Sequence, residues 1–204
     1  MSNEFKVWTP ANIVSLARMS VFPLIVVLGY AENWVASDSA KRTMTFVTAL
    51  AFALAFATDF VDGWLARSRN EVTRLGKLLD PLADKCMMVA ALIMLVHLGR
   101  CPAWIAIVIV VREIAITGLR QMASAEGIII AASGWGKLKT VLQAVAVGLL
   151  LWHYERDLFG FAFDAHLFGT IVLYAALAVT LWSGADYFFK FIRPPKESGA
   201  DQGA

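Results

Sequence analysis

Charged residues, cysteine and histidine are all scarce in this sequence of 204 residues. Charged side chains make up 17% of it and hydrophobic residues 59%, whereas soluble domains usually contain about 25% charged and about 45–50% apolar residues. The two cysteines, Cys86 and Cys101, form no pattern typical of a zinc site or a disulfide framework. The composition therefore excludes an ordinary soluble domain, and we expect no metal centre built from cysteine and histidine.

The sequence also lacks a cleavable signal, an internal repeat and a second domain. The first apolar stretch contains Arg18 and leads to no small-residue cleavage site, so we interpret it as an uncleaved helix after an interfacial segment at about residues 1–12. Without an internal repeat, a transporter built from inverted halves is disfavoured. We expect one membrane domain over residues 1–192 and a disordered polar tail over residues 193–204.

What the sequence does contain is six long apolar stretches. Each approaches or exceeds the ~20 residues that a helix needs to cross a ~30 Å hydrocarbon core. The sequence therefore predicts an all-α, polytopic membrane protein, built as a bundle of six transmembrane helices. The stretches cover about residues 12–31, 43–66, 81–98, 102–120, 137–153 and 166–190.

Lysine and arginine are distributed unevenly between the connecting segments. If the N-terminus is cytoplasmic, the outer segments contain only Lys41, Arg42, Arg100 and Arg156, and the other basic residues between spans lie inside. The positive-inside rule then predicts that both termini and the segment around residue 70 are cytoplasmic. We expect a multi-pass protein of the bacterial cytoplasmic (inner) membrane, whose basic side faces membrane lipids and phosphorylated solutes, and no nucleic-acid partner.

Four aspartates interrupt the apolar pattern between residues 57 and 85. Asp59 and Asp62 are three residues apart, and Asp80 and Asp84 are four apart, so each pair shares one face of a helix. If the segment between the pairs turns the chain back, the four carboxylates meet at the membrane boundary. Their mutual repulsion is relieved by divalent cations, and oxygen-only ligands favour Mg²⁺ or Mn²⁺. Two such ions could bind and polarise a diphosphate.

The complete pattern around these aspartates resembles the signature of the CDP-alcohol phosphatidyltransferases. It reads Asp59-x-x-Asp62-Gly63-x-x-Ala66-Arg67, then eight residues, then Gly76-x-x-x-Asp80-x-x-x-Asp84, with no position missing. The resemblance implies a six-helix membrane bundle, commonly a homodimer. It further implies that the four aspartates ligate two divalent cations, Mg²⁺ or Mn²⁺, and that Asp84 is also the general base.

The same resemblance assigns residues to the binding of CDP-diacylglycerol. The segment "NIVSLAR" is similar to the family's Asn-x-x-Thr-x-x-Arg segment near the lipid-nucleotide diphosphate, and Ser15 keeps the hydroxyl of the commoner threonine. Within the signature, Ala66 and Gly76 would leave room for the CDP moiety. The full implied set is Asn12, Ser15, Arg18, Asp59, Gly63, Ala66, Arg67, Thr73 and Gly76.

The acceptor alcohol has to be identified from the second half of the chain. Arg112 and Arg120 are eight residues apart, which is about 80° around a helix, so both can border one cavity. Glu113 lies almost in line with Arg120 and could form an ion pair with it. Together with Lys137 and Lys139, these cations suit an acceptor that is itself a phosphate ester. The alternative is that they are ordinary positive charges at helix ends.

The segments "REIAITGLR" and "SGWGKLKT" resemble the glycerophosphate-accepting branch of the family, the phosphatidylglycerophosphate synthases. This resemblance implies transfer of a phosphatidyl group from CDP-diacylglycerol to sn-glycerol 3-phosphate, with release of CMP. Three alternatives stay open. The acceptor could be inositol phosphate, serine or phosphatidylglycerol; the chain could be a divalent-cation carrier; or the aspartates could be ordinary charges paired with Arg67, Arg74 or Lys85.

Overall fold

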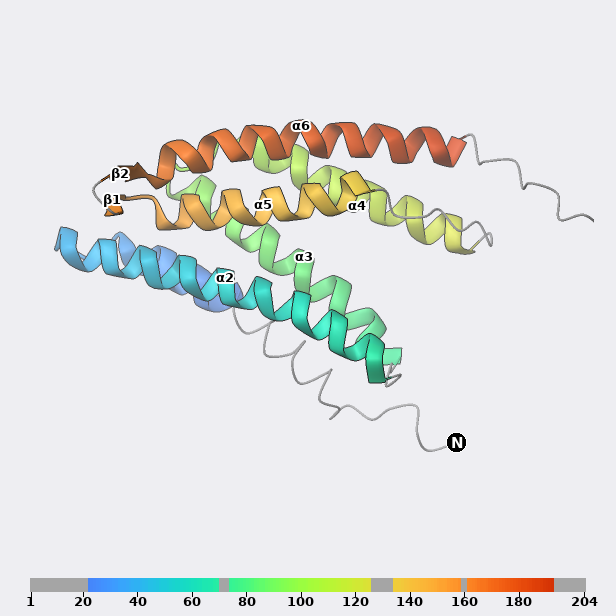
Figure 1. The fold of residues 1–204 in the computed structure, drawn as a ribbon, viewed down its shortest axis with the longest axis horizontal. Helices are drawn as coiled ribbons and strands as arrows, with labels where there is room; N and C mark the ends of the chain where they lie inside the picture. The colour runs from blue at the N-terminus through green and yellow to red at the C-terminus, as the bar shows by residue number, and fades with distance from the viewer. Residues whose placement is uncertain (1–21, 70–73, 126–133, 159–160, 193–204) are drawn as a thin grey trace, which may run out of the picture.

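The computed structural model describes residues 22–69, 74–125, 134–158 and 161–192 (Figure 1). For residues 59–84, 124, 125, 156–158 and 161 the description is limited to the backbone. The interfacial segment and the tail expected at residues 1–12 and 193–204 lie outside the described residues. The elements are a helical segment Phe22–Glu32, α2 Asp38–Arg69, α3 Arg74–His97, α4 Ala103–Ala125, α5 Gly134–Trp152, β1 Glu155–Leu158, β2 Phe161–Asp164 and α6 Ala165–Ile192.

Helices cover the last five predicted stretches, and the first stretch is described only from Phe22 onward. Helix α2 extends beyond its predicted stretch at both ends, α3 begins seven residues before its stretch, and α4 ends five residues after its stretch. The all-α class is confirmed, and the one addition in the described chain is a short antiparallel hairpin of β1 and β2 that joins α5 to α6. In its register Glu155 pairs with Asp164. The Phe163 ring, from β2, lies 5.9 Å from the Trp152 ring and 4.9 Å from the Phe168 ring, measured between centroids. Aromatic stacking at the helix ends thus favours a short hairpin where we had expected only a loop.

The helices alternate in direction, so the molecule has two distinct ends (Figure 1). We call the end at which α2, α4 and α6 finish and α3 and α5 begin the carboxylate end, and the opposite one the hairpin end. Helix α5 packs most extensively on α6, while α2 packs on α5 and α4 packs on α6. Helix α3 runs obliquely and contacts both α4 and α5. The four aspartates lie on α2 and α3. Helix α3 therefore connects this pair of helices to the group formed by α4, α5 and α6, which we call the α4–α6 group.

The core lies where these helices cross and extends toward the hairpin end. Close approach depends on small residues: a Cβ at Gly29 would lie 2.7 Å from Met94 Cε, and one at Gly169 would lie 3.0 Å from Leu150 Cγ. Interiors packed this tightly leave little room for added atoms. The largest fully buried side chains include Ile25, Phe52, Met87, Leu92, Leu95, Ile105, Ile109, Leu150, Leu151 and Leu173.

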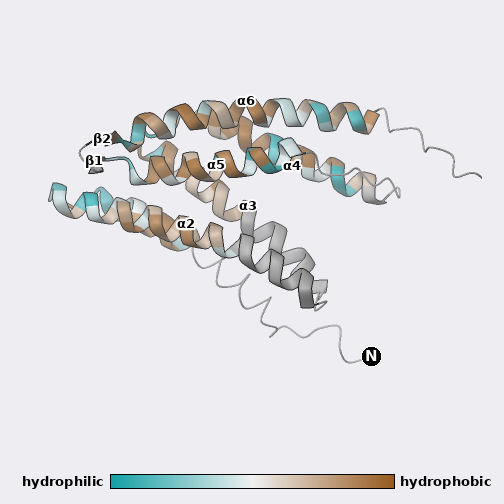
Figure 2. Ribbon diagram, viewed as in Figure 1, coloured by the Kyte–Doolittle hydropathy of each residue, from teal (hydrophilic) through white to brown (hydrophobic). Residues whose placement is uncertain are grey.

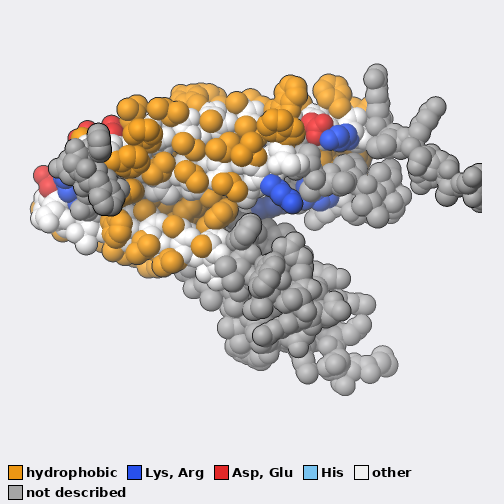
Figure 3. All heavy atoms as spheres, viewed as in Figure 1, with side chains coloured by type: hydrophobic (Ala, Val, Ile, Leu, Met, Phe, Trp, Pro, Cys, Tyr) orange, Lys and Arg blue, Asp and Glu red, His pale blue; other side chains and the backbone are white. Residues whose placement is uncertain are grey.

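The outer surface of the bundle is strongly apolar. Trp182 is 64% exposed, Phe189 67% and Ile114 67%, and hydrophobic side chains cover the visible faces of α5 and α6 between charged ends (Figures 2 and 3). A soluble monomer rarely exposes contiguous apolar surface on this scale. The surface is therefore that of a membrane protein.

Two stretches of the described chain are long and apolar enough to cross a membrane, Asp38–Thr58 in α2 and Ala165–Ile192 in α6. Helices α4 and α5, with 23 and 19 residues, have comparable length. Both carry charged residues within them, Arg112 and Glu113 in α4 and Lys137 and Lys139 in α5. These charged residues lower the mean hydropathy of α4 and α5.

A polar cluster joins three elements at the hairpin end. The Arg100 guanidinium forms an ion pair with Glu32 and donates a hydrogen bond to the Leu151 carbonyl oxygen at 3.2 Å. It thereby connects the Phe22–Glu32 segment, the α3–α4 connection and the end of α5. Beside it, His153 has a φ of 65° and its Nδ1 lies 3.2 Å from Nδ1 of His166.

We predict that Glu32→Ala lowers the free energy of unfolding by about 3–5 kcal/mol, the usual result of removing one partner from a buried ion pair. The side chains of Arg100 and Glu32 are 5% and 11% exposed, so the remaining guanidinium would have little access to water. Thermal unfolding of the detergent-solubilised protein measures the effect, with Glu155→Ala, at an exposed glutamate, as the control. Equal unfolding temperatures for the two variants would show that the pair does not stabilise the fold.

Candidate active site

The two aspartate pairs lie at matching depths on consecutive helices. Helix α2 ends at Arg69 and α3 begins at Arg74. At 1.5 Å of rise per residue, Asp62 lies ~10 Å before the end of α2 and Asp80 ~9 Å after the start of α3, while Asp59 and Asp84 both lie ~15 Å from those ends. Carboxylates at two matched levels are what a site for two hard divalent cations would require.

The side chains of these aspartates lie outside the described residues, so their predicted convergence on metal ions stays a prediction. Elsewhere in the described chain, no group of three or more His, Cys, Asp or Glu side chains could hold a metal ion. The backbone of α2 nevertheless places Asp59, Asp62, Gly63 and Ala66 on one helix face, because they follow an i, i+3, i+4, i+7 spacing.

The residues expected to bind CDP-diacylglycerol fall into two groups. Gly63, Ala66 and Arg67 lie in the last turns of α2, and Gly76 lies in the first turn of α3. These positions are at the carboxylate end, on the same helices as the aspartates. Their side chains, and the whole of Asn12, Ser15, Arg18 and Thr73, lie outside the described residues.

Glu113 is the centre of a polar cluster within the α4–α6 group. Its Oε1 accepts a hydrogen bond from Arg112 Nη1 at 3.1 Å and pairs with the Lys139 ammonium. The side chains of Arg112, Glu113 and Lys139 are only 13%, 21% and 7% exposed. Two of the four predicted acceptor-binding cations are thus brought together by one partly buried carboxylate.

The expected ion pair between Glu113 and Arg120 is not formed. The two residues are seven positions apart on α4, or ~10.5 Å along the helix axis, whereas Lys139 reaches Glu113 sideways from α5. Arg120 lies over the Tyr187 ring instead, with its Cζ 5.7 Å from the ring centroid. Arg120 is therefore held by a cation–π contact with α6, two turns nearer to the carboxylate end than Arg112.

A short chain of hydrogen bonds joins this cluster to α3. Lys85, the residue after Asp84, donates to Thr117 Oγ1, and the Thr117 hydroxyl donates to the Glu113 carbonyl oxygen at 2.7 Å. Lys85 was considered only as a partner for the aspartates, and Thr117 was not identified from the sequence. Lys85 directly follows Asp84, the predicted general base. The contact therefore links the part of α3 that carries Asp84 to the turn of α4 that carries Glu113.

Polar residues of α5 and α6 complete the cluster. Gln143 Nε2 donates to Thr180 Oγ1 at 3.0 Å, and Arg112 Nη2 donates to Ser183 Oγ at 2.9 Å. Thr180 and Ser183 were missed by the sequence analysis. A signal was available, because they are two polar residues three positions apart in a long apolar helix, and polar groups within a membrane segment usually face the protein interior.

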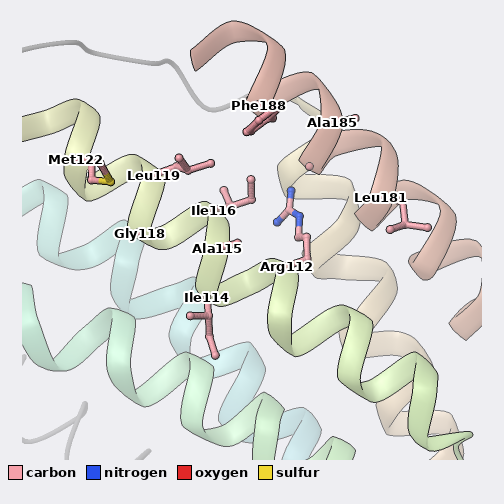
Figure 4. Close-up of a pocket in the computed structure, with 11 residues that line it drawn as sticks. Arg112, Ile114, Ala115, Ile116, Gly118, Leu119, Met122, Leu181, Ala185 and Phe188 are labelled. Atoms are coloured by element: carbon pink, nitrogen blue, oxygen red, sulfur yellow. The ribbon is translucent and has the colours of Figure 1, made fainter. Parts of the chain in front are cut away.

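A cavity of about 620 Å³ opens between α4 and α6 beside this cluster. Its lining is apolar apart from Arg112, and includes Ile116, Leu119, Leu181 and Phe188. Figure 4 shows the Arg112 side chain extending from α4 toward the turn of α6 that carries Leu181 and Ala185. The guanidinium thus separates an apolar cavity from the polar cluster on its other side.

Comparison with known proteins gives a consistent family. The sequence model described as CDP-alcohol phosphatidyltransferase matches residues 8–182. A CDP-diacylglycerol–glycerol-3-phosphate 3-phosphatidyltransferase of Bacillus subtilis is 40% identical over 186 residues, covering 88% of this chain and 93% of the relative. One of Haemophilus influenzae with the same name is 42% identical, over 85% of this chain and 88% of the relative. A probable phosphatidylglycerophosphate synthase of Mycobacterium tuberculosis is 36% identical, over 90% and 81%.

We predict that Glu113→Gln lowers the free energy of unfolding by about 3 kcal/mol, because it leaves the buried Lys139 ammonium without a counter-charge. The double variant Glu113→Gln, Lys139→Met should recover much of this loss, since an apolar side chain tolerates the same site. Thermal unfolding in detergent measures both. Asp186→Asn is the control, because it removes only the partly exposed pair with Lys190 and should change little. If the single variant unfolds like this control, Glu113 and Lys139 do not form the buried pair.

Proposed function

This chain belongs to the CDP-alcohol phosphatidyltransferase family, and on that basis we propose that it transfers the phosphatidyl group of CDP-diacylglycerol to sn-glycerol 3-phosphate. The products are phosphatidylglycerophosphate and CMP, and the reaction is a step in the synthesis of phosphatidylglycerol and cardiolipin. Two relatives that cover most of the chain carry the name of this reaction.

One structural observation supports the proposal above the others, the contact from Lys85 through Thr117 to Glu113. It joins the helix that carries Asp80 and Asp84 to the helix that carries Arg112. The enzyme needs a lipid-nucleotide site and an acceptor site close enough for one oxygen to attack one phosphorus. Phosphoryl transfer of this kind relies on positioning and electrostatics more than on covalent help from the protein.

We assign the chemistry at the lipid site to the four aspartates. Asp59, Asp62, Asp80 and Asp84 hold two divalent cations, Mg²⁺ or Mn²⁺, which when bound offset the charge of the diphosphate and of the departing CMP. Asp84 also accepts the proton of the primary hydroxyl of glycerol 3-phosphate. The resulting oxygen attacks the phosphorus that carries diacylglycerol, and the bond from that phosphorus to CMP breaks. CDP-diacylglycerol itself contacts Asn12, Ser15, Arg18, Asp59, Gly63, Ala66, Arg67, Thr73 and Gly76.

The acceptor phosphate binds to Arg112, Arg120, Lys137 and Lys139. Arg112 and Lys139 together carry two positive charges and Glu113 one negative charge, so the buried cluster has a net charge of +1. Arg120 and Lys137 are exposed and add further positive charge toward the carboxylate end. An excess of positive charge on fork-shaped and ammonium donors favours an acceptor with a phosphate ester over an uncharged alcohol.

We further propose how the enzyme sits in the membrane. Six helices of a single domain over residues 1–192 span the bacterial cytoplasmic membrane, and residues 193–204 form a disordered tail. Both termini and the active site face the cytoplasm, where most of the lysine and arginine lies. The protein is a homodimer among membrane lipids, and nucleic acid is no partner.

We predict that Asp84→Asn abolishes turnover and largely preserves binding of CDP-diacylglycerol, because the amide cannot accept the proton. Purified enzyme would be given labelled CDP-diacylglycerol with glycerol 3-phosphate, inositol phosphate, serine or phosphatidylglycerol, with and without chelator. Of the four acceptors, we expect only glycerol 3-phosphate to give product, and we expect no product from any of them when chelator is present. Asp186→Asn should behave as wild type. Near-normal activity of Asp84→Asn would exclude Asp84 as the base, and product from another acceptor alone would overturn the assigned substrate.

We predict that Arg112→Ala raises the KM for glycerol 3-phosphate at least about tenfold, the usual effect of losing a hydrogen bond to a charged group. The KM for CDP-diacylglycerol should stay close to that of wild type, because Arg112 lies on α4 and away from the predicted lipid site on α2 and α3. Steady-state kinetics with each substrate varied in turn separates the two effects. A change confined to CDP-diacylglycerol would move Arg112 to the lipid site.

A further inference from the structure

The Arg112 side chain crosses from α4 to α6 and meets two consecutive residues there. Its Nη2 donates to Ser183 Oγ at 2.9 Å, and its Nε lies beside Gly184. On the α4 side, Nη1 donates to Glu113 Oε1 at 3.1 Å. Each terminal nitrogen thus makes one hydrogen bond, and the second N–H of each makes none within the part of the chain that the structure describes.

The Ser183 hydroxyl is oriented to accept from this guanidinium. A hydroxyl has one proton, and that of Ser183 is donated to the Thr180 carbonyl oxygen at 3.2 Å. The oxygen lone pairs are therefore available to Arg112. Thr180 is in turn held by Gln143 Nε2 of α5, at 3.0 Å from its Oγ1. Ser183 is therefore held in position by contacts within α6 and, through Thr180, by α5.

Gly184 provides the space that the arginine occupies. A Cβ added at this position would lie 3.2 Å from Arg112 Nε and 3.3 Å from Arg112 Cγ, closer than side chains normally pack. Glycine is also a poor choice within a helix such as α6, where alanine is much more favourable. The helix itself does not require glycine at residue 184. The absence of a side chain there is explained by the Arg112 side chain, which occupies the space.

We infer that Ser183 and Gly184 are positioning residues for the acceptor phosphate, and that they act by holding the Arg112 guanidinium in one orientation. Ser183 provides a hydrogen bond from one side, and Gly184 lets the arginine stem lie flat against α6. With the fork oriented in this way, the remaining N–H of each terminal nitrogen can bind the phosphate oxygens of the acceptor. The inference rests on the proposed function, because it takes the phosphate of glycerol 3-phosphate as the ligand of Arg112.

The test measures the KM for glycerol 3-phosphate, at saturating CDP-diacylglycerol, in Ser183→Ala and Gly184→Ala. We expect each to raise this KM about tenfold and to leave the KM for CDP-diacylglycerol close to that of wild type. Gly148→Ala is the matched control, since Gly148 is also within a helix and a Cβ there would meet nothing within 4 Å. Ser183→Ala removes a single oxygen atom, so it remains informative if Gly184→Ala does not fold.

A double-mutant cycle separates positioning from a general packing defect. If the two residues act through the guanidinium, neither substitution should raise the acceptor KM further in an Arg112→Ala background. A packing defect would add its effect in that background as well, and this additivity would overturn the inference.

The remaining outcomes distinguish the inference from the proposed function. If Arg112→Ala raises the acceptor KM while Ser183→Ala and Gly184→Ala match Gly148→Ala, the inference fails and the acceptor site stands. If Arg112→Ala itself leaves the acceptor KM unchanged, both the inference and the assignment of Arg112 to the acceptor fail.

Discussion

The ion pairs of Glu113 are the interaction on which the rest of the candidate site depends. Arg112 and Lys139 belong to different helices, and both are largely withdrawn from water. Two like charges in such a place would repel each other and be costly to bury. A single carboxylate between them removes that obstacle and links α4 to α5 through the Lys139 ammonium. Once Glu113 is in place, the two cations have defined positions.

This arrangement divides the work between two parts of the bundle. Helices α2 and α3 carry the four aspartates, whose carboxylates suit metal ions. Helices α4, α5 and α6 carry the cations, which suit a phosphate. A lipid substrate already lies in the membrane, and a phosphorylated acceptor arrives from water, so the proposed assignment of the two substrates to two separate parts of the bundle fits their two sources. Only a few side chains need to connect these parts, and Lys85 with Thr117 provides such a connection.

The sequence predicted the helices well because their apolar length is a property of the local chain. It also assigned Arg112 and Lys139 to one site; the structure brings both to Glu113, and their binding of an acceptor stays a prediction. It missed the β1–β2 hairpin, which is only four residues long in each strand and depends on stacking between Trp152, Phe163 and Phe168. It paired Glu113 with the wrong arginine, because a helical projection shows residues in line along one helix and does not show a lysine approaching from the next. The convergence of the four aspartates, inferred from spacing alone, stays a prediction.

The ion pair between Glu32 and Arg100 has a consequence for how the protein is made. The two partners are 68 residues apart in the chain, and at 5–20 residues per second the ribosome adds that length in roughly 3–14 s. During this interval the glutamate of the first helix has been synthesised and its arginine has not. Insertion of the first helices therefore has to tolerate an uncompensated carboxylate, and the hairpin end can close only after the third helix and the turn that follows it have emerged.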